Sequence, residues 1–243
     1  SDREATACTQ AGIRPVRLEL ARDALVFFTR KSSPAPECLS TGDVYALMGP
    51  EAVGTRRWRQ VATVAHAVGG SARLPDAPLV VVVPEGGSGT SQLVEDSVIG
   101  PIARKRSQQA GIRPDALTVP SDQVMLSEVL KAPAAVAFAG YATVRPWGAS
   151  VRPIAVNAGS GCVAPSEQSI RDGSYPLARS LYLYVDPEAA RRNATAAAFT
   201  TAMVQGATRA GEGAGVIALD AQRAGATTQA WDAALSDGDV TGT

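Results

Sequence analysis

The chain has 243 residues, of which 23 are Lys or Arg and 23 are Asp or Glu, so its formal net charge is zero. This length is sufficient for one large domain or for two lobes with a sizeable core. The balanced charge, without a basic stripe that carries interleaved aromatic residues, argues against binding to extended nucleic acid. No apolar run approaches the roughly 20 residues that are needed to cross a bilayer.

Helix and strand patterns alternate along the chain. The main signals are apolar residues at helical spacing, runs of β-branched residues, and Ser or Asp before a helical pattern. In chain order, the sequence predicts a helix at 4–11, strands at 16–20 and 24–29, a helix capped by Ser40, a strand at 79–83, a helix at 90–99, a helix capped by Ser121, strands at 135–139, 151–156 and 181–185, and helices at 187–205 and 220–235. Pro101 is expected to break or kink the helix at 90–99. This alternation indicates an α/β fold with largely parallel sheets.

A glycine-rich turn, Gly86-Gly87-Ser88-Gly89-Thr90, follows the apolar run at 79–83 and precedes a helical pattern that begins at Thr90. Glycines let the backbone approach a ligand closely, and the first N–H groups of a helix lack intrahelical partners. The start of a helix also carries about half a positive charge. Because Ser88 and Thr90 add two hydroxyl donors, the segment is typical of an anion-binding site.

The three cysteines are Cys8, Cys38 and Cys162. Their spacing excludes a zinc cluster, so no metal site is expected. Two interpretations remain open. Either all three are free or buried thiols, or Cys8 and Cys38 form a disulfide, which would close a loop of roughly 30 residues and imply an oxidising compartment.

Two enzyme classes fit the glycine-rich turn poorly. A hydrolase would use Ser88 as its nucleophile, but the strand-turn-helix elbow requires Gly-x-Ser-x-Gly, and Thr90 stands at the last position. Its base would have to be His66, the only histidine. A phosphoryl-transfer enzyme needs a lysine in its phosphate loop, which this turn lacks. The sequence therefore predicts a binding protein without catalytic residues and without a cofactor.

Several segments stand in a characteristic order. They are Gly87-Ser88-Gly89-Thr90 after a strand, the run Ala-Ala-Val-Ala-Phe-Ala-Gly-Tyr-Ala at 134–142, and the segment from Val-Ala-Pro-Ser at 163–166 through the run at 173–185. Together with residues 8–13 and 38–40, this set strongly resembles the phosphate-binding protein of bacterial phosphate ABC transporters. The similarity extends over most of the chain, and the ordered set is far more specific than any single motif.

The resemblance implies the fold of a type II periplasmic binding protein, an α/β architecture in which two lobes close over the ligand. It makes residues 1–30 and 179–243 one discontinuous lobe, and residues 31–178 the continuous lobe. The positions that match the phosphate-binding residues of the family are Gly87, Ser88, Gly89 and Thr90. These residues belong to the continuous lobe.

The chain departs from the family pattern in two places. Family members carry a further segment ahead of the position that corresponds to Ser1, so the lobe built from the chain ends is expected to be incomplete: either the chain is a fragment, or this lobe is trimmed and half of the ligand cage is missing. Pro84 stands where many members have an arginine that contacts phosphate through two hydrogen bonds. Attraction of an anion therefore depends on backbone dipoles and hydroxyl groups.

The function that the resemblance implies is that of a secreted, monomeric solute-binding protein. Such a protein is periplasmic or extracellular, free or membrane-anchored. It captures inorganic phosphate in the cleft between its lobes and delivers it to an ABC permease in the membrane. The alternative is a sensor or scaffold of the same fold that has lost or weakened phosphate binding.

Overall fold

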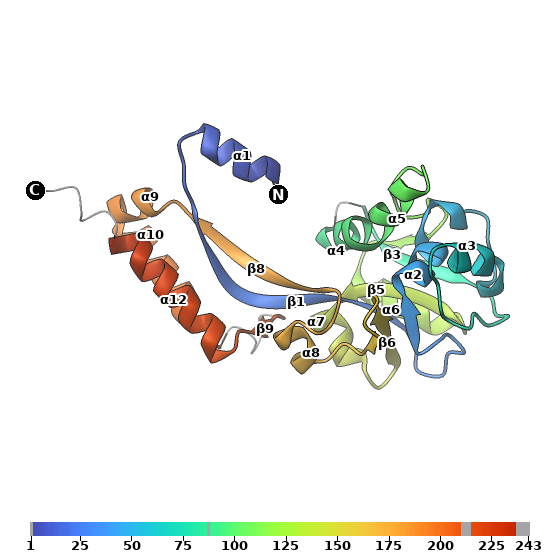
Figure 1. Ribbon diagram of the computed structural model, residues 1–243. Coiled ribbons are helices and arrows are strands. Elements are labelled where there is room, and N and C mark those ends of the chain that lie inside the picture. Colours follow the sequence, from blue (N-terminus) through green and yellow to red (C-terminus); the bar gives the residue numbers. More distant parts are fainter. Residues whose placement is uncertain (1, 87, 210–214, 237–243) are drawn as a thin grey trace, which may run out of the picture. The chain divides into compact units, whose positions relative to one another are not determined.

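The computed structural model describes residues 2–86, 88–209 and 215–236 (Figure 1). The chain divides into two compact units. Unit 1 consists of Ser1–Asp23 and Arg179–Thr243, and unit 2 is the continuous segment Ala24–Ala178. One boundary falls inside the long strand β1 (Val16–Arg30), and the other falls at the start of β8 (Ala178–Val185).

The central sheet of unit 2 has the strand order β2-β6-β1-β5-β3-β4. Besides β1, its strands are β2 (Cys38–Ser40), β3 (Val80–Pro84), β4 (Leu117–Val119), β5 (Ala135–Gly140) and β6 (Val151–Asn157). Strand β3 pairs in parallel with β4 and β5, whereas β1 runs antiparallel to both β5 and β6. Strand β2 also pairs in parallel with β6. The sheet is therefore mixed, and the prediction of largely parallel sheets fails at β1, which lies between two strands that run opposite to it.

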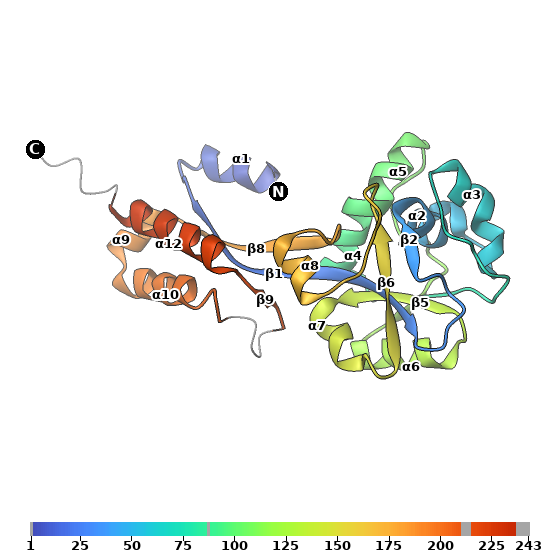
Figure 2. The ribbon, with the colours of Figure 1, turned by 60° about the horizontal axis from the view of Figure 1, so that its bottom comes forward.

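Helices cover both faces of this sheet. Figure 2 shows α6 (Asp122–Lys131) and α7 (Tyr141–Val144) on one side, and α4 (Gly89–Val94) and α5 (Gly100–Lys105) on the other. The core between the sheet and α6 includes Val82, Met125 and Val129, all of which are buried. The other elements of unit 2 are α2 (Thr41–Met48), α3 (Ala62–Ala67), α8 (Glu167–Asp172), β7 (Cys162–Val163), and 3-10 turns at Pro50–Ala52, Trp58–Val61 and Arg145–Trp147.

Unit 1 contains the outer parts of β1 and β8 together with the remaining elements. These are α1 (Asp2–Gln10), α9 (Pro187–Arg192), α10 (Ala194–Gln205), β9 (Ile217–Ala218) and α12 (Ala221–Ser236). Its core joins Leu18 of β1 to Ala190 of α9, Val204 of α10 and Trp231 of α12. In the part of the chain that the structure describes, no helix combines the length and apolar character needed to cross a membrane.

The single helix predicted at 187–205 is wrong, because the chain forms two helices there. Asn193 separates α9 from α10 with an extended backbone conformation. Its side-chain oxygen accepts hydrogen bonds from the N–H groups of Thr195 and Ala196, each at 3.1 Å. An Asn side chain that caps a new helix competes with continuation of the previous one.

The helix predicted at 90–99 continues past Pro101 through a wider turn. Residues Glu95–Ile99, labelled η3, form a π-helical turn between α4 and α5. The N–H of Gly100 donates to the carbonyl of Glu95, and a Cβ at Gly100 would lie only 2.8 Å from that oxygen. Because Pro101 has no N–H to donate, the extra residue in the turn lets the helix continue instead of breaking.

Asp43 joins the start of α2 to a neighbouring loop. As expected, Ser40 caps this helix, since its hydroxyl accepts the N–H of Asp43 at 3.0 Å. One carboxylate oxygen of Asp43 accepts the N–H groups of Ser40 at 2.8 Å, Ser71 at 3.2 Å and Ala72 at 3.0 Å. Asp43 is fully buried, so removal of its carboxylate leaves buried donors without a partner.

The disulfide of this protein joins Cys38 to Cys162, and the predicted Cys8–Cys38 pairing is wrong. Cys38 lies on β2 and Cys162 on β7, and both strands pair with residues 155–157 of β6. This shared partner brings the two Cα atoms to 6.0 Å although 124 residues separate them in the sequence. Cys8 lies on α1 and is not disulfide-bonded.

We expect Asp43→Ala to lower the free energy of unfolding by about 3 kcal/mol, because it removes a helix cap and leaves buried N–H groups unpaired. Ser40→Ala removes the hydroxyl that caps the helix and donates to the Asp43 carboxylate at 2.7 Å, but leaves that carboxylate its backbone N–H donors, and should cost about 1 kcal/mol. Urea denaturation measures both values. A loss for Asp43→Ala no larger than that for Ser40→Ala would contradict the joining role of the carboxylate.

Replacing Cys38 and Cys162 together by serine should lower the free energy of unfolding by about 4 kcal/mol, because the cross-link closes a long loop in the unfolded chain. Cys8→Ser is the matched control and should leave stability unchanged. Denaturation under non-reducing conditions measures the difference. Equal stability of the double variant and the control would show that the disulfide is not formed in the folded protein.

Candidate functional site

The glycine-rich turn lies at the carboxyl end of β3. Strand β3 ends at Pro84, and α4 begins at Gly89. The N–H of Glu85 donates to the carbonyl of Val119 at 3.0 Å, which joins the turn to the end of β4. Because β3 is parallel to β4 and β5, the three strands end at the same edge of the sheet. Ligands of open α/β sheets bind at this edge.

Ser88 is the N-cap residue of α4. Its backbone is extended, and its hydroxyl oxygen accepts the N–H of Ser91 at 3.1 Å. The hydroxyl groups of Ser88 and Ser91 also lie 3.0 Å apart, within hydrogen-bonding distance. The cap therefore sets where the helix begins and the direction in which its first N–H groups point.

Gly89 and Thr90 are the first two residues of α4. Gly89 is exposed, and a Cβ placed on it would meet no atom within 4 Å. Thr90 is half-buried, and neither its N–H nor its hydroxyl has a hydrogen-bond partner within residues 2–86, 88–209 and 215–236. The structure thus places three of the four predicted residues at the start of one helix. The fourth, Gly87, lies outside the described residues.

A cavity of about 220 Å³ adjoins the turn. Its lining includes Ser88 and three residues that the sequence analysis missed, namely Ser91, Gln92 and Glu95. Their spacing along the chain from Ser88, at intervals of three or four residues, could have indicated them, because residues at this spacing share one face of a helix. Gly89 and Thr90 are not among the lining residues, so the cavity adjoins the turn on the Ser88 side.

Arg113 also lines this cavity, but its charge is compensated. It is only 4% exposed, and its guanidinium donates two hydrogen bonds of 2.7 Å to the carboxylate of Asp115. These bonds hold the pKa of the Asp115 carboxyl well below its usual range. Two further bonds of 3.0 Å go to the hydroxyl and the carbonyl of Thr55. Among the described lining residues, Glu95 is left as the one charged side chain without an ionic partner.

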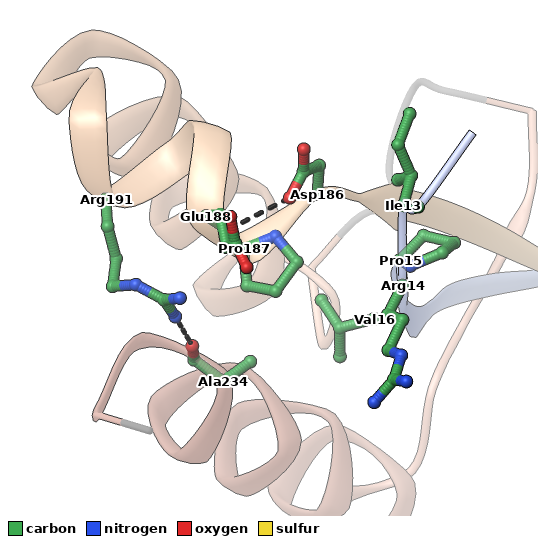
Figure 3. Close-up of a pocket in the computed structure, with 10 residues that line it drawn as sticks. Ile13, Arg14, Pro15, Val16, Asp186, Pro187, Glu188, Arg191 and Ala234 are labelled. Carbon is green, nitrogen blue, oxygen red and sulfur yellow. Dashed lines mark hydrogen bonds between the residues drawn. The ribbon is translucent and has the colours of Figure 1, made fainter. Parts of the chain in front are cut away.

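A larger cavity, of about 510 Å³, lies within unit 1 (Figure 3). It is lined by residues 12–16, by the start of α9 and by Ala234 of α12. Asp186 caps α9 by accepting the N–H of Glu188 at 3.0 Å, and Arg191 donates to the carbonyl of Ala234 at 2.6 Å. Figure 3 shows the side chain of Arg14 directed away from Asp186. These polar groups do not converge on one point. Because three segments that lie far apart in the sequence form the cavity, no sequence pattern predicts it.

Other candidates for chemistry do not assemble into a site. In the described ranges, no group of three or more His, Cys, Asp or Glu side chains is placed to hold a metal ion. His66 is an exposed residue of α3, and within the same ranges it makes no hydrogen bond to Ser88. The glycine-rich turn is therefore the candidate site that both the sequence and the structure support.

The family model of the PBP superfamily domain matches residues 1–205. The chain is 28% identical over 229 residues to Protein SphX of Synechococcus elongatus, an alignment that covers 93% of this chain and 62% of that protein. It is 26% identical over 192 residues to Protein SphX of Synechocystis, covering 78% and 52%. The chain thus spans between half and two thirds of the length of these relatives.

Two solved structures illustrate the structural likeness. A possible phosphate binding protein from Planctomyces limnophilus matches with a TM-score of 0.77 and 20% identity, over 97% of this chain and 78% of that one. PstS from Borrelia burgdorferi matches with a TM-score of 0.60 and 19% identity, over 87% and 74%. These likenesses confirm the predicted fold class, that of the type II periplasmic binding proteins. Because the family model matches most of the sequence, this chain belongs to the PBP superfamily domain family.

Proposed function

We propose that this chain is part of an extracytoplasmic solute-binding protein that binds inorganic phosphate and delivers it to an ABC transporter. Membership of the PBP superfamily domain family supports a binding role. The names of the similar structures from Planctomyces limnophilus and Borrelia burgdorferi support phosphate as the ligand. The observation that carries the proposal is the pair of donors on Thr90 that have no partner among the residues the structure describes, at the start of a helix that follows a buried strand.

The proposed phosphate-binding residues are Gly87, Ser88, Gly89 and Thr90. A phosphate ion taken out of water needs several short, charge-assisted hydrogen bonds to replace its hydration. The start of α4 contributes a partial positive charge from the aligned peptide dipoles, and Thr90 contributes an N–H and a hydroxyl. Ser88 can keep its cap while it donates to phosphate, because its oxygen accepts the N–H of Ser91. Its proton, which it donates to the Ser91 hydroxyl in this structure, would turn to the ligand.

Binding outside the cytoplasm is the proposed setting for this function. The Cys38–Cys162 disulfide supports it, since disulfides persist in oxidising compartments such as the periplasm and the extracellular space. The proposed partner is the membrane permease of a phosphate transporter, and the proposed action is capture and delivery without a chemical step. Capture works by mass action, because phosphate favours whichever conformation of the protein binds it more tightly.

Calorimetric titration of the full-length gene product with inorganic phosphate tests the proposal. We expect saturable one-to-one binding, weakened at least about tenfold by Thr90→Val, because a hydrogen bond to a charged group contributes about 1.5 to 3 kcal/mol. Thr90→Ser is the matched control and should keep most of the affinity, since it retains the hydroxyl and loses only a methyl group.

Two results would contradict the proposal. No binding heat from the intact protein would favour the sensor or scaffold alternative, and unaltered affinity in Thr90→Val would place the phosphate elsewhere. Thermal melting of each variant without ligand checks that folding is unchanged. Titration with sulfate, run in parallel, shows whether the site distinguishes phosphate from other tetrahedral anions.

A further inference from the structure

A further cavity, of about 300 Å³, lies in unit 2 at the amino ends of β3 and β4. Because these strands are parallel, the cavity lies at the edge of the sheet opposite to the glycine-rich turn. Leu79, Val81 and Leu117 form an apolar part of its lining, and Leu117 is 41% exposed. Liquid water takes about 30 Å³ per molecule, so the volume admits a side chain of several heavy atoms.

The backbone of Arg56, an exposed residue of the lining, is fixed in place. Its carbonyl accepts the N–H of Leu79 at 2.8 Å, and its N–H donates to the side-chain oxygen of Gln60 at 2.6 Å. Trp58 is fully buried and donates its indole N–H to the carbonyl of Ala134 at 2.8 Å. This wall of the cavity is therefore formed before any ligand binds.

Arg56 also gives the cavity a positive charge. Its side chain has no hydrogen-bond or ionic partner in the part of the chain that the structure describes. The other charged residues of the lining, Arg113 and Asp115, neutralise each other through two hydrogen bonds of 2.7 Å. The carboxylate of Asp76 is engaged by Arg57 at 2.7 Å. The described lining thus has a net charge of one sign.

The sequence around Arg56 adds further positive charge. Residues 52–80 include four arginines and one acidic residue, Asp76, although the whole chain has no net charge. Arg57 and Arg59 share the Asp76 carboxylate at 2.7 and 3.8 Å, and their side chains are 47% and 72% exposed. An exposed excess of cations attracts an acidic partner from a distance and opposes a basic one.

Strand β4 favours a protein segment as the occupant of this surface. It is the last strand in the order of the sheet, so within the described ranges one of its sides has no neighbouring strand. Leu117 and Thr118 of this strand are exposed. The unpaired N–H and C=O groups of an edge strand can receive an extended segment of another chain. A lipid headgroup has no backbone to pair with such an edge.

We propose that this surface docks an extended acidic segment of a partner protein that carries one apolar side chain. The surface consists of the cavity, the three arginines of residues 56–59 and the free edge of β4. The apolar side chain enters the cavity beside Leu117, and the acidic side chains lie over Arg56 and its neighbours. This inference goes beyond the proposed phosphate function and does not rest on it, because the glycine-rich turn lies at the opposite edge of the sheet.

Fluorescence anisotropy of labelled peptides, titrated with the full-length gene product, tests this inference. The peptides are Glu-Glu-Leu-Glu-Glu, Glu-Glu-Ser-Glu-Glu and Lys-Lys-Leu-Lys-Lys. We expect the first to bind about tenfold more tightly than the second, because burial of a leucine side chain contributes about one decade of affinity or more. The basic peptide should not bind detectably. Added salt should weaken binding of the acidic peptides, since it screens exposed charges.

Arg56→Glu should weaken binding of Glu-Glu-Leu-Glu-Glu at least about tenfold, because it replaces an attraction by a repulsion. Leu117→Ser should lower the affinity for this peptide to that for the serine peptide. Arg192→Glu makes the same change of charge on α9 of unit 1, so it is the matched control and should leave peptide binding unchanged. Thermal melting of each variant checks that folding is unaltered.

Equal affinities for the two acidic peptides, or binding that survives in Arg56→Glu, would overturn the inference. Absence of peptide binding would overturn it as well, and binding to phosphatidylglycerol vesicles that depends on Arg56 would then assign the surface to a membrane. Titration of Arg56→Glu with inorganic phosphate should give the affinity of the unaltered protein. Failure of the docking inference therefore leaves the proposed phosphate function standing.

Discussion

The Ser88 cap is the interaction on which the candidate site depends. It fixes the point where the chain, after leaving β3, enters α4. Without a cap of this kind the first turn of a short helix would be free to unwind. A hydroxyl that holds the first turn in place thereby positions Thr90, two residues further on.

The same helix connects the candidate phosphate site with the cavity beside it. Ser88, Ser91, Gln92 and Glu95 lie on one face, and the π-helical turn at Glu95 lets the helix continue to Lys105 despite Pro101. The start of α4 carries a partial positive charge from its aligned peptide dipoles, and the negatively charged carboxylate of Glu95 lies within two helical turns of it.

Local patterns in the sequence predict the parts of this fold that local interactions decide. The Ser40 and Ser121 caps, the buried strand β3 and the turn before α4 follow from neighbouring residues, and the structure has all of them. The family resemblance adds the fold class, which composition and periodicity alone leave open. Asn193 is a case where the sequence pattern fails. The alanine-rich run predicts one helix, but the Asn193 side chain caps a second helix within it.

Features that depend on pairing between distant segments were beyond the sequence patterns. The mixed character of the sheet follows from β1 running antiparallel between β5 and β6. The disulfide follows from two strands that share β6 as a partner, which the sequence does not reveal, so the pairing considered for Cys38 named the wrong cysteine. The cavity beside the turn requires Arg113, whose neutral pairing with Asp115 only the structure shows.

The central claim is that amide and hydroxyl donors at the start of α4 bind the phosphate ion. Amide nuclear magnetic resonance of the full-length gene product during titration with inorganic phosphate tests it directly. The account predicts a saturable downfield shift of the Thr90 amide proton, among the largest in the spectrum, together with shifts of its neighbours in the turn. Saturable binding that leaves the Thr90 amide unshifted and moves resonances elsewhere would contradict it.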